Sequence, residues 1–461
     1  MSAPPNRPAQ NLGPLSWAVR IGYGAGDFGL VLTFQLAGLF LLFFMTEALG
    51  LSQMTAGLII LAGLLFDGVS DIGMGVLADR LRGRLGGFRP WLLMGGPLLA
   101  GSTALMFFAP PLQGVALAAA ALGAQVLFRA AFTVVAIPFG ALSSAMTEDS
   151  RERSLLVGIR LTFASFAALT VALGVPPAVA AFGAGEPRLG FQAAAVAVGL
   201  TAMVFVLIAY ASTREVKPGQ TPAALGYLVA DLPGMAVRNG PFLQVAVCAF
   251  LYASAQGLIL AGAPYFFSFV RGEPETLGLC LGVMIGGVAV FVPVWTVIAR
   301  RIGKRASWII GAGWSAAALA GLAIAWDAPL PFFLAGIIAA SFGFAAINLI
   351  GFSMLPDTVE YAEWRYGVRV EAALFAALTL LQKAGVGVAA AGSGFLLSLA
   401  GHSSDSPMAG PGAAMFGAAL FLTPAMLLAA SIFAIWRYPL STRLHARLVR
   451  ALAWRRKRRQ R

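Results

Sequence analysis

Long apolar segments alternate with short polar connections along almost the whole chain. An α-helix of about 20 apolar residues spans the hydrocarbon core of a bilayer, because it makes its backbone hydrogen bonds within the segment. The pattern therefore predicts an all-α membrane protein. We expect twelve transmembrane helices, six on each side of the longest polar connection, near residues 21–46, 54–77, 90–109, 115–142, 155–179, 189–211, 241–270, 277–299, 306–326, 330–355, 371–400 and 413–436.

The longest polar connection divides the chain into two similar parts. Short basic loops that contain glycine follow both the second and the eighth expected span, at 75–84 and 299–305. Two six-helix pseudo-symmetric halves with a substrate site between them are a known transporter plan. We expect four regions: an N-terminal six-helix bundle, a cytoplasmic linker, a C-terminal six-helix bundle and a basic cytoplasmic tail, at 1–213, 214–240, 241–436 and 437–461.

The number and distribution of charged residues support the prediction of a membrane protein. Only 11% of the residues are charged, against about 25% in soluble domains. Most of the 32 Lys and Arg lie in alternate loops, which predicts a multi-pass protein of the inner (plasma) membrane with both termini cytoplasmic. Positive-inside topology explains the net charge of +13 without a nucleic-acid partner. The two cysteines fall in expected spans and the two histidines outside them, so we expect no disulfide framework, no metal site and no histidine relay across the membrane. We also expect no cofactor, no enzyme activity and a monomer in the bilayer.

Two acids stand out within the second expected span. Asp67 and Asp71 are four residues apart, so a helix places them on one face, and Ser70 shares that face. An ionised group at membrane depth costs about 2.5–3.5 kcal/mol on insertion scales, so both acids are expected to face a polar cavity. The functional interpretation is a site for a cation or proton. The alternative is a static salt bridge to Lys383 or Arg129, two further charged residues within spans.

Several sequence motifs occur in register along the chain. Together they resemble the glycoside–pentoside–hexuronide:cation symporter family of the major facilitator superfamily, over about residues 16–400. The motifs are Tyr23-Gly-Ala-Gly-Asp-Phe-Gly29, Phe66-Asp-Gly-Val-Ser-Asp71, Gly75-x-x-x-Asp79-Arg80-x-Arg82-Gly83-Arg84, Ile137-Pro-Phe139, Asp357-Thr-Val-Glu-Tyr-Ala-Glu-Trp364 and Gln382-Lys383.

The resemblance implies cation-coupled uptake of a sugar-like or glycoside-like solute by alternating access. It places the cation site at Asp67, Asp71, Ser70 and Thr133. The coupling ion is H⁺ or Na⁺, because relatives that use sodium often carry Asn where this chain has Ser70. It also assigns Lys383 and Arg160 as charged partners that couple the ion to the solute, with a structural counter-charge as the alternative for each.

The sequence departs from the family at the solute. The two acids and the Trp that hold the sugar in the family align with Val31, Ala136 and Gly140. A carrier of an amphipathic or lipid-like solute, such as a lysolipid, is therefore the alternative. A sensor that does not transport and a channel are two further classes. A sensor would accumulate no solute in vesicles, and a channel would conduct without accumulating solute.

Other polar residues are candidates for the cavity and for a gate. For the substrate cavity we name Asp27, Gln125, Arg129, Tyr265, Gln256 and Gln382. For a cytoplasmic gate we name the acids in the loop after the tenth span and the basic loop after the second, which lie on the same side of the membrane: Asp79, Arg80, Arg84, Asp357, Glu360 and Glu363. In the gate interpretation, ion pairs join the two halves. The alternative is a solvated charged surface, where exposed pairs contribute about 0–1 kcal/mol each.

Overall fold

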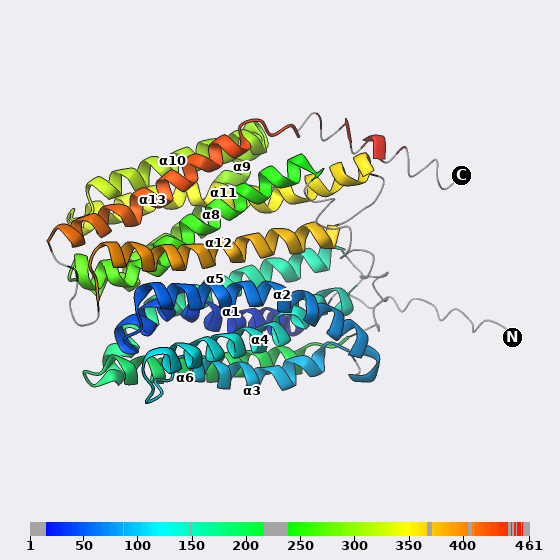
Figure 1. Ribbon diagram of the computed structural model, residues 1–461. Coiled ribbons are helices and arrows are strands. Elements are labelled where there is room, and N and C mark those ends of the chain that lie inside the picture. Colours follow the sequence, from blue (N-terminus) through cyan, green and yellow to red (C-terminus); the bar gives the residue numbers. More distant parts are fainter. Residues whose placement is uncertain are drawn as a thin grey trace.

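The structure is a computed structural model in which long helices run roughly parallel to one another (Figure 1). It describes residues 15–85, 87–147, 150–215, 238–366, 371–403, 408 and 410–440, and a few tail residues between 444 and 454. The helices of the first half are α1 (Trp17–Phe43), α2 (Gln53–Leu85), α3 (Arg89–Met106), α4 (Gly114–Met146), α5 (Ser150–Gly183) and α6 (Pro187–Ser212). Those of the second half are α8 (Gly240–Tyr265), α9 (Thr276–Ile302), α10 (Lys304–Ile324), α11 (Leu330–Tyr366), α12 (Glu371–Leu399) and α13 (Pro411–Ile435).

Each expected span falls on one of these helices, so the prediction of twelve spans is confirmed in position. Eleven of them are long and apolar enough to cross a membrane. The exception is α3, which has 18 residues and contains Pro97. Side chains cap some helix starts where backbone N–H groups lack partners: Ser16 Oγ accepts from the Val19 amide, and Asn239 Oδ1 accepts from the Phe242 amide.

Several helices extend further than the hydrophobic pattern indicated. α2 continues to Leu85, through the segment from Asp79 that we expected to be a loop, and α11 continues to Tyr366. The acids Asp357, Glu360 and Glu363 therefore lie on a helix and not in a loop. The physical reason is that bilayer thickness limits the apolar length of a span but not the length of the helix. A helix continues into the aqueous phase until a residue such as glycine ends it.

The helices pack as two groups with a seam between them. In the first group α1 packs on α5 and α6, and α4 packs on α2 and α3. In the second, α8 packs on α12 and α13, and α10 packs on α11 and α13. Figure 1 shows α1–α6 (blue to green) on one side and α8–α13 (green to red) on the other. Across the seam, α2 packs along α12, α5 packs against α9, and α1 packs against α8.

The first helix of each group ends in a π-helical turn. η1 (Phe44–Ala48) follows α1, and η2 (Phe266–Val270) follows α8. Such turns are rare and occur frequently at functional sites, because they re-aim the side chains that follow. Both π-helical turns lie at the end of the bundle opposite the basic segments. We call this the outer end.

Candidate functional site

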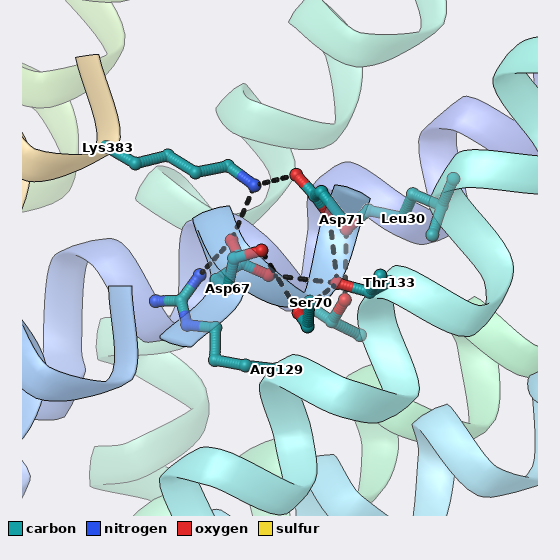
Figure 2. A network of polar contacts seen from close by, with 8 residues as sticks. Leu30, Asp67, Ser70, Asp71, Arg129, Thr133 and Lys383 are labelled. Carbon is teal, nitrogen blue, oxygen red and sulfur yellow. Dashed lines mark hydrogen bonds and ion pairs between the residues drawn. The ribbon is translucent and has the colours of Figure 1, made fainter. Parts of the chain in front are cut away.

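The acids of α2 lie against α4, where a hydroxyl group holds both of them. Thr133 Oγ1 lies 3.1 Å from Asp67 Oδ1 and 2.9 Å from Asp71 Oδ1. Ser70 Oγ lies 3.2 Å from the same Thr133 oxygen and donates to the Asp67 carbonyl. The four residues that the sequence assigned to a cation site are thus brought together at one place (Figure 2). Asp67 is fully buried, and the Asp71 side chain is 20% exposed.

Two basic side chains approach this acid pair from different helices. Lys383 reaches across the seam from α12, with Nζ 2.8 Å from Asp67 Oδ2 and in contact with Asp71 Oδ2. Arg129, one turn before Thr133 on α4, places Nη1 3.8 Å from Asp67 Oδ2. Figure 2 shows the Lys383 and Arg129 head groups at different sides of the Asp67 carboxylate. Two carboxylates, one ammonium and one guanidinium sum to zero charge, which is how a buried ionic cluster avoids an uncompensated charge.

A cavity of about 330 Å³ lies between the two groups of helices, beside this cluster. Lys383 forms part of its wall, which joins the ion cluster to the cavity. The first half contributes Phe34 and Leu64, and the second half contributes the polar groups, which are Tyr252, Gln256, Asn348, Thr379 and Gln382. Its volume falls in the range of about 300–1,000 Å³ that is usual for small-molecule sites.

The remaining cavity candidates lie elsewhere. Asp27 accepts a hydrogen bond of 2.8 Å from Arg160 Nη2, and the Arg160 guanidinium lies 4.8 Å from the Phe139 ring centroid. These contacts are within the first half and do not border the cavity just described. Gln125 is fully buried, and its side chain packs against Gly63 of α2. Of the six candidates, Gln256 and Gln382 line this cavity, and Arg129 belongs to the ion cluster.

Tyr265 lies in a group of residues that close the outer end of the seam. Its hydroxyl is 2.5 Å from Thr46 Oγ1, and its ring packs on Phe43. Glu47 Oε1 is 2.9 Å from Nε2 of His402, a residue that follows α12 and is buried although the sequence placed it in a loop. The His402 ring packs at a tilt against the Phe269 ring of η2, with centroids 4.7 Å apart, and the His402 carbonyl accepts a hydrogen bond from Gln53 Nε2. We call Phe43, Thr46, Glu47, Gln53, Tyr265, Phe269 and His402 the outer seal.

The structure describes the side chains of only some of the expected gate residues. The side chains of Asp79, Arg80 and Arg84 lie outside the described part of the chain. Asp357 accepts from Lys304 Nζ at 2.7 Å, a contact between α11 and α10 within the second half. Lys304 Nζ also donates to the Ser353 carbonyl. Sequence reasoning missed this partner, although Lys304 stands in the basic segment 299–305 that marked the repeat. An ion pair from these acids to the first half stays a prediction.

These features define a class. An all-helical bundle of two six-helix groups, with buried acids at the seam beside a cavity, is a membrane transporter of the major facilitator type. A crystal structure of a D-xylose-proton symporter has the same fold: the match covers 92% of this chain and 98% of that one, with a TM-score of 0.67 at 14% identity. The expected fold class is therefore confirmed.

The sequence also identifies the family. The chain belongs to the MFS/sugar transport protein family, whose model matches residues 22–442. It is 28% identical over 420 residues to the isoprimeverose transporter of Lactiplantibacillus pentosus, covering 88% of this chain and 85% of the relative. It is 27% identical over 446 residues to an uncharacterized symporter of Bacillus subtilis, covering 95% of each chain. The resemblance drawn from the motifs is thereby confirmed.

Proposed function

We propose that this protein is a cation-coupled secondary active transporter of a sugar-like or glycoside-like small solute, which it moves by alternating access. The observation that carries the proposal is the contact of Lys383 from one half with Asp67 and Asp71 of the other. This contact lies on the wall of the cavity between the halves. A cation that binds the two acids competes with Lys383 for them. Its arrival therefore weakens a contact between the halves and changes the charge at the wall of the solute cavity.

The walls of the cavity support a hydrophilic solute. The amide groups of Gln256, Asn348 and Gln382 and the hydroxyl groups of Tyr252 and Thr379 supply donors and acceptors of the kind that hydroxyl groups of a sugar require. Phe34 supplies an aromatic ring on the opposite helix group, against which the apolar face of a sugar ring packs. A lysolipid would need a long apolar channel for its chain, so this lining favours the sugar-like solute over the lipid-like one. The isoprimeverose transporter among the relatives supports the same class of solute.

The outer seal supports the alternating-access part of the proposal. Glu47 and Thr46 of the first half contact His402 and Tyr265 of the second, and they do so at one end of the seam. A carrier closed at its outer end, with a cavity at mid-depth, corresponds to one of two end states. In this proposal the protein is a monomer of the inner (plasma) membrane with both termini in the cytoplasm, and the outer seal opens toward the other side.

The proposal is tested with purified protein in lipid vesicles. Imposed proton or sodium gradients are combined with a panel of labelled neutral sugars, glycosides and hexuronides, and accumulation inside the vesicles is measured. We expect one gradient to drive accumulation of at least one solute above its outside concentration. Asp71→Asn is expected to abolish this coupling while the protein stays folded, as checked by thermal unfolding. Solute accumulation that is still driven by the gradient in Asp71→Asn would refute the site, and passive equilibration without accumulation would indicate a channel.

A further inference from the structure

Arg129 has surroundings that differ from those of the other basic residue at the site. It is 3% exposed and lies on α4, in the same half as the acids, whereas Lys383 comes from the other half. Its guanidinium lies over two aromatic rings, 5.2 Å from the Phe34 centroid and 5.5 Å from that of Phe128. Among the residues that the structure describes, its Nε and Nη1 donate no hydrogen bond. What Arg129 contributes at the acids is therefore mainly a fixed positive charge, 3.8 Å from Asp67 Oδ2.

A fixed charge and a movable charge have different consequences for a metal ion. A guanidinium does not lose its proton in proteins, and Arg129 is attached to the same helix as Thr133. When the second half moves away and takes Lys383 with it, Arg129 stays beside Asp67, because both belong to the first half. A sodium ion placed among the oxygens of Asp67, Asp71 and Thr133 would then lie near a like charge.

The oxygen atoms alone would suit sodium, but the basic groups do not. Thr133 Oγ1 lies within 3.1 Å of Oδ1 of both acids, which resembles a cation cradle. However, Oδ2 of both acids is occupied by Lys383, and Oδ2 of Asp67 also faces Arg129. A like charge at roughly 6–8 Å, in an effective dielectric of about 20, lowers the affinity for a monovalent cation by about 30-fold to 100-fold. Arg129 therefore makes these oxygens a much weaker site for a sodium ion than the two acids alone would be.

We propose that Arg129 is an internal counter-charge that keeps sodium off the acid pair, so that a sodium ion does not drive this carrier. The inference rests on the proposed function, because it concerns the ion that is coupled to the solute. It also gives Asp67, which is fully buried in this structure, a counter-charge within its own half. In this proposal Lys383 neutralises the acids only in the conformation in which the two halves meet here, whereas Arg129 neutralises one carboxylate throughout the transport cycle.

The test measures sodium binding directly and needs no knowledge of the solute. The melting temperature of the purified full chain is compared in sodium chloride and choline chloride at equal ionic strength, because a ligand that binds the folded state stabilises it. We expect no difference in the unmutated protein. Arg129→Met should gain a rise of about 1 °C or more at 100 mM sodium, since a cation bound well above its dissociation constant adds about 1 kcal/mol or more.

Two control variants make the result specific. Arg129→Lys keeps the charge and should stay insensitive to sodium. The double variant Arg129→Met with Asp71→Asn removes one carboxylate and should lose the gained response. Sodium stabilisation of the unmutated protein would overturn the proposal, as would a folded Arg129→Met that does not respond. Should Arg129→Met fail to fold, Arg129→Gln takes its place, and the measurement on the unmutated protein still decides.

Transport separates this inference from the proposed function. In vesicles, accumulation driven by a proton gradient and not by a sodium gradient supports both proposals. Accumulation driven by sodium refutes the role of Arg129 and leaves coupled transport standing. If neither gradient drives any solute of the panel, the proposal of coupled transport fails, while the sodium titration on the purified protein still decides the role of Arg129.

Discussion

The contact between α2 and α12 at the outer end depends on glycine, and a single methyl group should disturb it. A Cβ added to Gly394 would lie 2.2 Å from the Gln53 carbonyl oxygen, and one added to Gly57 would lie 2.7 Å from the Ala391 Cα. The atoms that would be met are backbone atoms, which cannot turn aside as the end of a long side chain does. Gly394→Ala therefore forces the two helices apart by about 1 Å, since non-bonded C and O atoms pack at roughly 3.5 Å.

The energetic consequence follows from this overlap. An extra methyl group in a packed interface costs about 1–3 kcal/mol. The cost falls on the conformation in which the outer end is closed, because a conformation with an open outer end separates α2 from α12 there. A bias of this size moves the equilibrium between the two conformations about 5-fold to 150-fold toward the outward-open one. The folded state as a whole should survive, because the carrier relieves the overlap by opening.

A distance measurement across the outer end checks this. Spin labels are placed at the exposed positions Leu112 and Leu399, one on each half, with Cys248 and Cys280 replaced by alanine. We expect Gly394→Ala to shift the distribution toward longer distances. The matched control is Gly101→Ala in α3, where an added Cβ meets nothing within 4 Å. An unchanged distribution in a folded Gly394→Ala would refute the argument, and an equal shift in Gly101→Ala would show that the effect is not specific to the seam.

Three further substitutions have outcomes set by single contacts. Lys383→Met leaves the fully buried Asp67 with one basic neighbour, so we expect a loss of stability of up to about 3–5 kcal/mol in thermal unfolding. Tyr265→Phe removes the hydroxyl contact with Thr46, worth about 1 kcal/mol, and should raise the rate at which a membrane-impermeant thiol reagent labels a cysteine placed at Gln53, a buried residue of the outer seal. Lys304→Gln removes the ion pair between Lys304 and the buried Asp357 and should lower the melting temperature, whereas Arg305→Gln, at the next residue, is the control.

The fold was predictable from the sequence because a bilayer imposes one strong rule. A backbone in hydrocarbon must satisfy its own hydrogen bonds, so each apolar run of about 20 residues becomes a helix. That rule says nothing about where a helix ends in water. The extensions of α2 to Leu85 and of α11 to Tyr366 were accordingly missed. The π-helical turns after α1 and α8 also escaped the pattern, since they differ from an α-helix by a single residue of register.

The ion cluster was predictable for a related reason, and the outer seal was not. Asp67, Asp71 and Lys383 are expensive at membrane depth, so their presence in apolar segments is itself a signal. Glu47 and His402 stand at the ends of spans, where charged and polar residues are ordinary. They are 355 residues apart, and no spacing or motif links them. The ion pair of Asp357 with Lys304 could not be predicted either, because the basic segments 75–84 and 299–305 both contain residues that could pair with this acid.

The contacts between α2 and α12 differ along the seam, and their positions suggest which of them respond to the ion and which close the outer end. From the outer end inward, α2 meets α12 first through Gln53 and Gly394, then through Leu61 and Gly387, and then at the ion cluster. The glycine contacts are steric and do not respond to ions, whereas Lys383 meets the acids through two ion pairs and a hydrogen bond to Asp71. In the proposed mechanism, a cation that binds the acids loosens the seam at mid-depth without touching the outer seal. In this division the ion determines when the halves are free to rock, and the glycine contacts determine how tightly the outer end closes.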